Sequence, residues 1–165
     1  MFPTDDRDEV EPPSVPAGLV LAPLGRRVIG ELIDELLIFL PAAVGAAIVG
    51  YRLGDDISDD AILVFNVALA ATALAYKTLM IGGLARTVGK YVTGTRVVRL
   101  LDGGSPGWFS ATQRALVPVV ATGIPEVGWV LGPIVYGWAF FSPLRQGIHD
   151  RAAGTVVVLH RRPVA

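Results

Sequence analysis

The chain of 165 residues contains no cysteine, so disulfide bonds, thiol catalysis and cysteine-ligated zinc or iron–sulfur centres are excluded. Charged residues are also scarce, at 18% of the chain, against about 25% in an average soluble domain. The 14 basic and 15 acidic residues nearly cancel. This balance argues against a nucleic-acid-binding protein, because such proteins present a basic face.

Features of enzymes are equally scarce. The stretch RTVGKYVTGTRVV lacks the GxxxxGK[ST] pattern of a phosphate-binding loop, and no serine lies in a nucleophile elbow. His149 and Asp150 are neighbours, but adjacency alone makes no catalytic dyad, and the spacing of the two histidines supports no metal site. We therefore expect no enzyme activity, no cofactor, and no catalytic, cofactor-binding or metal-binding residues.

Long uncharged runs are what the sequence contains instead. They extend from about Glu31 to Tyr51, from Ala61 to Leu84 with only Lys77 as an interruption, and from Ala115 to Leu144 with only Glu126. A helix needs roughly 20 apolar residues to cross a ~30 Å hydrocarbon core. Because a soluble bundle rarely contains three such segments, we predict an all-α membrane protein with about three transmembrane helices.

The third apolar segment is ambiguous, because two ordinary spans would need about 40 residues. Thr122–Pro125 contains the helix breakers glycine and proline. We expect a short interfacial or tilted helix near Ser110–Ala121, a turn at Gly123–Pro125, and a spanning helix over Val127–Phe141, kinked by Pro133. The segment either spans once or returns as a broken helical hairpin.

The distribution of Lys and Arg predicts a topology, since these residues concentrate on the cytoplasmic side. The loop 52–60 carries one Arg and four Asp, whereas 83–114 carries five cations against Asp102 alone. This places the N-terminus in the cytoplasm. Three simple crossings would export the C-terminal stretch, although its arginines favour the inside.

Two β-prone runs, Thr95–Leu101 and Thr155–His160, lie outside the apolar segments. We predict that they pair as a small cytoplasmic sheet, which requires both on one side of the membrane. The domain organisation we expect is an acidic, proline-rich disordered tail at 1–23, a membrane domain at 24–160 and a basic tail at 161–165.

Charges near membrane helices are costly and therefore informative. Glu31, Asp34 and Glu35 share one face of the first helix, with Arg27 one turn before Glu31 and Lys77 as a plausible counter-ion on the second helix. One interpretation is a structural ion-pair network; the other is a cation or proton site. We further expect Asp150 to pair with a nearby arginine or to cap the turn that carries Gly154 into the last strand. Contacts with anionic lipid headgroups are predicted for Arg86, Lys90, Arg96 and Arg99.

Three stretches together resemble the RDD family of small bacterial membrane proteins, named for an arginine and two aspartates. They are RRVIGELIDELL, TVGKYVTGTRVVRLLDG and RQGIHDRAAGTVVV, and the resemblance covers about residues 24–160. On this resemblance the arginine of the family matches Arg27, and its aspartates match Asp34 and Asp150.

The resemblance implies a role in or beside membrane transport. Some members look like Na⁺(Li⁺)/H⁺ antiporters, and others are accessory subunits of larger machinery. We therefore weigh two functions. The first is an accessory or scaffold subunit that packs on another membrane protein or on copies of itself through small-residue faces. The alternative is a Na⁺/proton exchanger that uses Asp34, with Arg27 as its partner. Membrane lipids are partners in both, a monovalent cation only in the second, and nucleic acid in neither.

Overall fold

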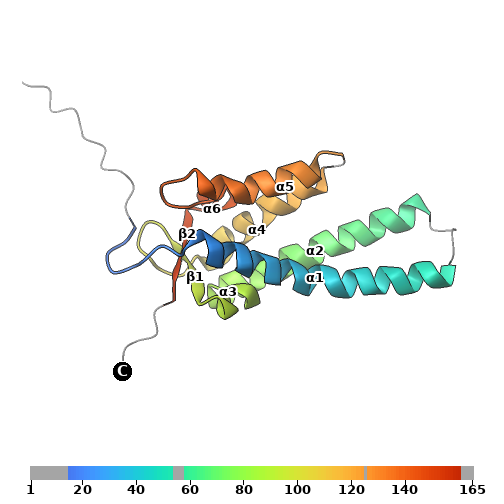
Figure 1. Ribbon diagram of the computed structural model, residues 1–165, viewed down its shortest axis with the longest axis horizontal. Coiled ribbons are helices and arrows are strands. Elements are labelled where there is room, and N and C mark those ends of the chain that lie inside the picture. Colours follow the sequence, from blue (N-terminus) through green and yellow to red (C-terminus); the bar gives the residue numbers. More distant parts are fainter. Residues whose placement is uncertain (1–14, 54–57, 125, 161–165) are drawn as a thin grey trace, which may run out of the picture.

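Two long helices dominate the computed structural model, which describes residues 15–53, 58–124 and 126–160 (Figure 1). Helix α1 comprises Leu24–Leu53 and helix α2 comprises Asp59–Leu84. Both are long and apolar enough to cross a membrane, with a mean hydropathy of 2.1 in an 18-residue window of α1 and 1.7 in one of α2. Helix α1 begins before the apolar run, so its first turns carry charged side chains.

The ends of α2 follow from local chemistry. The Ser58 side chain caps the first turn by accepting a hydrogen bond from the Ala61 backbone N–H at 3.3 Å. Asp59 and Asp60 lie in that turn, where acidic residues interact favourably with the helix dipole. The helix ends where Ala85 adopts a left-handed conformation with φ 57°.

The third apolar segment forms a helical hairpin that returns to the end from which it started (Figure 1). Helix α4 comprises Gly107–Gly123, and helix α5, Gly128–Gly137, continues as a single 3₁₀ turn, η1, at Trp138–Phe140. The predicted break between two helices is present. The spanning helix predicted for Val127–Phe141 is not confirmed, because the ten residues of α5 rise only ~15 Å.

Strands β1 (Thr95–Arg99) and β2 (Thr155–Leu159) form an antiparallel pair. Thr95 lies opposite Leu159, and Arg99 opposite Thr155. The predicted pairing of the two β-prone runs is therefore confirmed, with each strand slightly shorter than its run. Because strands that pair lie together in space, the chain must return to the same side of the membrane between them.

The two strands end two similar units. Each unit is a helical hairpin followed by a five-residue helix, a left-handed glycine and a five-residue strand. The short helices are α3, Val88–Val92, and α6, Ile148–Ala152, and the glycines are Gly94 (φ 67°) and Gly154 (φ 60°). The short helix, glycine and strand of the second unit lie 60 residues after their counterparts; α3, for example, begins at Val88 and α6 at Ile148. The α1–α2 hairpin thus corresponds to the shorter α4–α5 hairpin.

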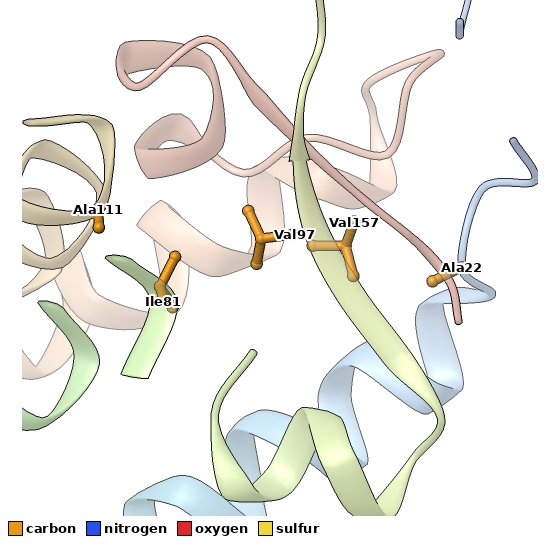
Figure 2. Packing of buried hydrophobic residues seen from close by; sticks show 5 residues of the cluster. All are labelled: Ala22, Ile81, Val97, Ala111 and Val157. Atoms are coloured by element: carbon orange, nitrogen blue, oxygen red, sulfur yellow. The ribbon is translucent and has the colours of Figure 1, made fainter. Parts of the chain in front are cut away.

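The sheet is covered on both faces, which explains the unbroken valine run of β2. On one face, Val97 and Val157 pack with Ile81 of α2 and Ala111 of α4 (Figure 2). On the other, Val98, Val156 and Val158 pack with Leu144; all these residues are buried.

Residues 20–22 complete the core, although they fall within the tail predicted to be disordered. Leu21 forms a β-bridge with Val158, and the fully buried Ala22 donates its N–H to the Val157 carbonyl at 3.0 Å. The ordered part of the protein therefore begins before residue 24. Most of the predicted N-terminal tail and the C-terminal tail 161–165 lie outside the described residues.

Candidate functional site

The five residues predicted as a polar cluster lie together at the sheet-side ends of the long helices. Arg27, Glu31 and Asp34 come from α1, Lys77 from α2, and Asp150 from α6. Lys90 of α3 and Arg114 of α4 join them as further ion-pair partners. We call these seven residues and Glu35 the ion-pair cluster.

Asp34 is completely buried and holds the start of α3 against α1. Its carboxylate accepts hydrogen bonds from the Tyr76 hydroxyl at 2.8 Å, the Thr87 hydroxyl at 2.5 Å and the Gly89 backbone N–H at 2.8 Å. The Lys90 ammonium lies 3.8 Å away. The carboxylate therefore has its hydrogen-bonding positions occupied by groups of the protein itself.

A close crossing of α1 and α3 makes this arrangement possible. A Cβ atom on Gly89 would lie 1.9 Å from the Gly30 carbonyl oxygen and 3.0 Å from the carboxyl carbon of Asp34. No side chain fits there. Glycine at position 89 is what lets the backbone N–H of α3 reach the buried carboxylate of α1.

Glu31 lies between two lysines. Its carboxylate is 2.5 Å from the Lys90 ammonium and 3.6 Å from that of Lys77. Lys77 also binds Glu35 at 2.6 Å and donates to the Tyr136 hydroxyl at 2.9 Å. The predicted counter-ion role of Lys77 toward the acidic face of α1 is therefore present.

The prediction that Lys90 contacts lipid headgroups is wrong. Lys90 is only 4% exposed, and its ammonium group is paired with Glu31. The sequence places a lysine in a basic segment, but α3 turns it inward because the acids of α1 lie beneath. Burial lowers the pKa of Lys90, and the Coulombic attraction of Glu31 opposes that shift.

Asp150 is the second fully buried carboxylate of the cluster. It forms ion pairs with both Arg27 and Arg114, and it accepts the Gly147 backbone N–H at 3.0 Å at the start of α6. The expected pairing with an arginine is therefore present. The turn that the Asp150 side chain caps is the first turn of α6, and not the turn that leads through Gly154 into β2. Arg27 pairs with this distant aspartate, and no ion pair joins it to Glu31 or Asp34 among the described residues.

Arg114 belongs to the cluster although it was not predicted as a member, because in the sequence it is only one of several cations in a basic segment. Its position carries a signal nevertheless. Ala111, Ala115 and Pro118 lie three residues before, one after and four after Arg114, and all are buried on the same face of α4. An arginine on the buried face of a helix requires a buried acid.

The other three residues predicted to contact lipid lie closer to the surface. The Arg86 guanidinium stacks over the Tyr91 ring at 4.7 Å, and Arg99 forms an exposed ion pair with Asp102 at 2.7 Å. Arg96 lies half-buried on β1. Their contact with headgroups stays a prediction.

A cavity of about 10 Å³ lies at the centre of the cluster, which is room for about one water molecule. It is lined by Glu31, Lys77, Arg114, Tyr136 and His149, among others. Burial lowers the pKa of His149 well below its usual range, and the nearby Arg114 reinforces the shift. His149 is therefore neutral at pH 7.

The charges of the cluster compensate one another. Four carboxylates, Glu31, Asp34, Glu35 and Asp150, face four cations, Arg27, Lys77, Lys90 and Arg114. Within the described ranges, no group of three or more His, Asp or Glu side chains is placed to hold a metal ion. The arrangement joins α1, α2, α3, α4 and α6 into one unit.

Two apolar helices long enough to span a bilayer, with a compensated charge cluster at one end, are features of a membrane protein. The chain belongs to the RDD family, whose sequence pattern matches residues 21–154. It is also 35% identical over 94 residues to the uncharacterized membrane protein YteJ of Bacillus subtilis (strain 168). That match covers 57% of this chain and 52% of YteJ, so the chain spans about half the length of this relative. No solved structure matches the chain significantly.

Proposed function

We propose that this RDD protein is an accessory subunit of a larger membrane assembly, such as a transport system, and that α1 and α2 bind the other components. The observation that carries the proposal is the exposure of these helices. Only 11% of the apolar window of α1 and 6% of that of α2 are buried within the chain. The ion-pair cluster fixes the helices at one end, and their far halves project beyond the rest of the protein (Figure 1).

The projecting half of α1 is suited to close helix packing. Ala42, Ala43, Ala46 and Ala47 lie on one broad side of the helix together with Gly50, and Gly45 lies at the edge of that side. Small residues let two membrane helices approach closely, and the resulting van der Waals packing stabilises helix association in lipid. Val44 and Ile48 lie on the opposite side and serve as a matched comparison.

Leucine at Ala46 tests the proposal. In mild detergent the wild-type chain should purify at fixed stoichiometry with another membrane protein. Ala46→Leu should abolish this association, whereas Val44→Leu on the opposite side should preserve it. Recovery of the wild-type chain alone, or equal behaviour of the two variants, would contradict the proposal.

The topology we propose places the sheet and both termini in the cytoplasm, in a bacterial plasma membrane. The basic surface around Arg86 and Arg96 and the acidic start of α2 support this orientation. The absence of cysteine offers a clean labelling test. An impermeant maleimide added to intact cells should label Ser58→Cys, whereas Ser105→Cys should react only after the cells are opened. Labelling of Ser105→Cys in intact cells, with Ser58→Cys protected, would show the opposite topology.

Na⁺/proton exchange through Asp34 is the competing function. Its support is the burial of charged groups at the ends of membrane helices. The three protein donors that already occupy the Asp34 carboxylate weigh against it. The test is Na⁺-dependent proton flux in proteoliposomes. Flux that disappears in a folded Asp34→Asn variant would support exchange and displace the subunit proposal.

A further inference from the structure

The α4–α5 hairpin ends well short of the α1–α2 hairpin (Figure 1). Helix α4 runs antiparallel to α2, and the Trp108 ring lies directly beside Gly82. Lys77 shares its cavity with Ala115 and Pro118 of α4. Because the helices are antiparallel, each residue farther along α4 lies beside a residue earlier in α2. The hairpin tip near Ile124 therefore lies at the level of about residues 66–69 of α2.

The first residue of α2, Asp59, lies roughly 7–10 residues beyond that level. This part of the helix is roughly 10–15 Å long. If Asp59 and Asp60 mark the outer membrane surface, as the proposed topology has it, the tip lies that far beneath the surface. The α4–α5 hairpin is then re-entrant. It enters the hydrocarbon from the cytoplasmic side, turns inside it and leaves on the same side.

The tip carries a carboxylate at this depth. Glu126 is exposed and has φ 65°, and its carbonyl accepts the Trp129 indole N–H at 2.8 Å. Irregular backbone at membrane depth is tolerated only where protein or a water-filled cavity covers it, and a charged side chain there needs a partner. The apolar segments 36–51, 61–76 and 115–141 contain no lysine or arginine, so this chain offers no cation at the depth of Glu126.

An open apolar hollow of about 840 Å³ begins at the same place and follows α5 toward the sheet. Trp129, Val130, Pro133, Trp138 and Phe141 are among the residues that line it. The carboxylate at the tip and the hollow beside it together form a surface with one charged end. A membrane helix with one basic residue would match both parts.

We propose that the hairpin tip and this hollow bind a transmembrane helix of a different protein, which carries a lysine or arginine at mid-membrane depth that pairs with Glu126. A second copy of this chain does not fit, because rotation about an axis along the membrane normal keeps every residue at its own depth. Such a copy would bring no cation to the tip, only apolar residues, the neutral amide of Asn66 or another Glu126. The proposal rests on the proposed function and names the chemistry of the partner.

The depth of the tip is tested first. A chain with Trp129 as its single tryptophan (Trp108→Phe, Trp138→Phe) is placed in phosphatidylcholine vesicles brominated either near the headgroup or near the end of the acyl chain. Trp129 fluorescence should be quenched more strongly by the deep bromines. The matched chain that keeps only Trp108 should show the opposite preference. Shallow quenching of Trp129 would overturn the re-entrant topology and this inference with it.

The partner is tested in the native membrane with the full chain. A photoreactive benzoylphenylalanine at Val127 should form an adduct with a membrane protein whose cross-linked helix contains a mid-depth lysine or arginine. Glu126→Lys should lower the adduct yield about tenfold or more, because two like charges then meet in low dielectric. Asp60→Lys, the same charge change at the far end of α2, should leave the yield unchanged.

Exchange of the two charges completes the test. Combining Glu126→Lys with a glutamate at the basic residue of the partner should restore the adduct. Adducts only with a second copy, no adduct, or a yield insensitive to Glu126→Lys would overturn the inference. One such result would still leave the proposed function intact. If Trp129 is deep and Ala46→Leu abolishes co-purification with another membrane protein, only the role of Glu126 fails.

Discussion

Replacing Asp150 with asparagine tests whether the ion-pair cluster holds the protein together. The carboxylate is completely buried between Arg27 and Arg114, whose side chains are only 10% and 3% exposed. Asparagine keeps the size and one carbonyl acceptor but removes the negative charge. Two guanidinium groups are then left in a buried site without their counter-ion.

The expected cost follows from that geometry. Removing one partner of a buried ion pair costs about 3–5 kcal/mol, because the remaining charge stays desolvated. At about 2–4 °C per kcal/mol for a chain of this size, Asp150→Asn should lower the Tm in detergent by roughly 6–20 °C. The exposed Asp102, which pairs with Arg99 at the surface, provides the control, since such pairs contribute about 0–1 kcal/mol.

The assay is thermal unfolding followed by tryptophan fluorescence in one detergent. A second comparison removes a cation as well: Asp150→Asn with Arg114→Gln should regain part of the lost Tm, because only one guanidinium then lacks a counter-ion. The reasoning is refuted if Asp150→Asn shifts Tm no more than Asp102→Asn does. Strict additivity of the Asp150 and Arg114 changes would likewise show that the two side chains do not interact.

Two further changes probe the same end of the molecule. Gly89→Ala should lower Tm by about 6 °C or more, because a Cβ forced against the Gly30 carbonyl costs about 3 kcal/mol. Gly45→Ala is the control and should shift Tm by less than about 2 °C, since a Cβ there meets nothing within 4 Å. Equal shifts would contradict the close crossing of α1 and α3. Because burial depresses the pKa of His149, the unfolded state alone binds its proton below about pH 6.5, so stability should fall by up to about 1.4 kcal/mol per pH unit as pH drops below that value. Tm measured against pH should lose this dependence in His149→Gln but keep it in His160→Gln, and an unchanged slope in the first variant would refute a neutral His149.

Local patterns predicted the elements that depend on local chemistry. Apolar runs located α1 and α2 because a membrane span needs a run of fixed length. The glycine and proline at Gly123–Pro125 located the break between α4 and α5. The valine-rich runs located β1 and β2, and the pairing was predicted because two β-prone runs outside the apolar segments can satisfy each other's backbone hydrogen bonds.

Partner choice within the cluster could not be predicted in the same way. Helical spacing indicates that Arg27 shares a face with Glu31, but it contains no information about a carboxylate 123 residues away. Lys90 looked like a surface cation for the same reason, since only the crossing of α3 over α1 shows that it is buried. Ion pairs act through space, so their choice depends on tertiary packing.

The two similar units explain why Arg27 selects a distant partner. Lys90 and Asp150 occupy the same third position of α3 and α6, yet they carry opposite charges. Lys90 binds Glu31 of its own unit, whereas Asp150 binds Arg114 of its own unit and Arg27 of the other. Two lysines or two aspartates at these equivalent positions would leave like charges in one buried cluster.

The charges balance in number within each unit, but one ion pair, Arg27 with Asp150, joins the two units. If the second unit is displaced, Arg27 loses Asp150. Lys77 loses its contact with the Tyr136 hydroxyl in the same event. The first unit alone would therefore leave Arg27 without its ion-pair partner, and the cost of that favours the state in which both hairpins are docked. We expect the end of the protein around the sheet to unfold as a single cooperative unit, while the far halves of α1 and α2 stay available to a partner.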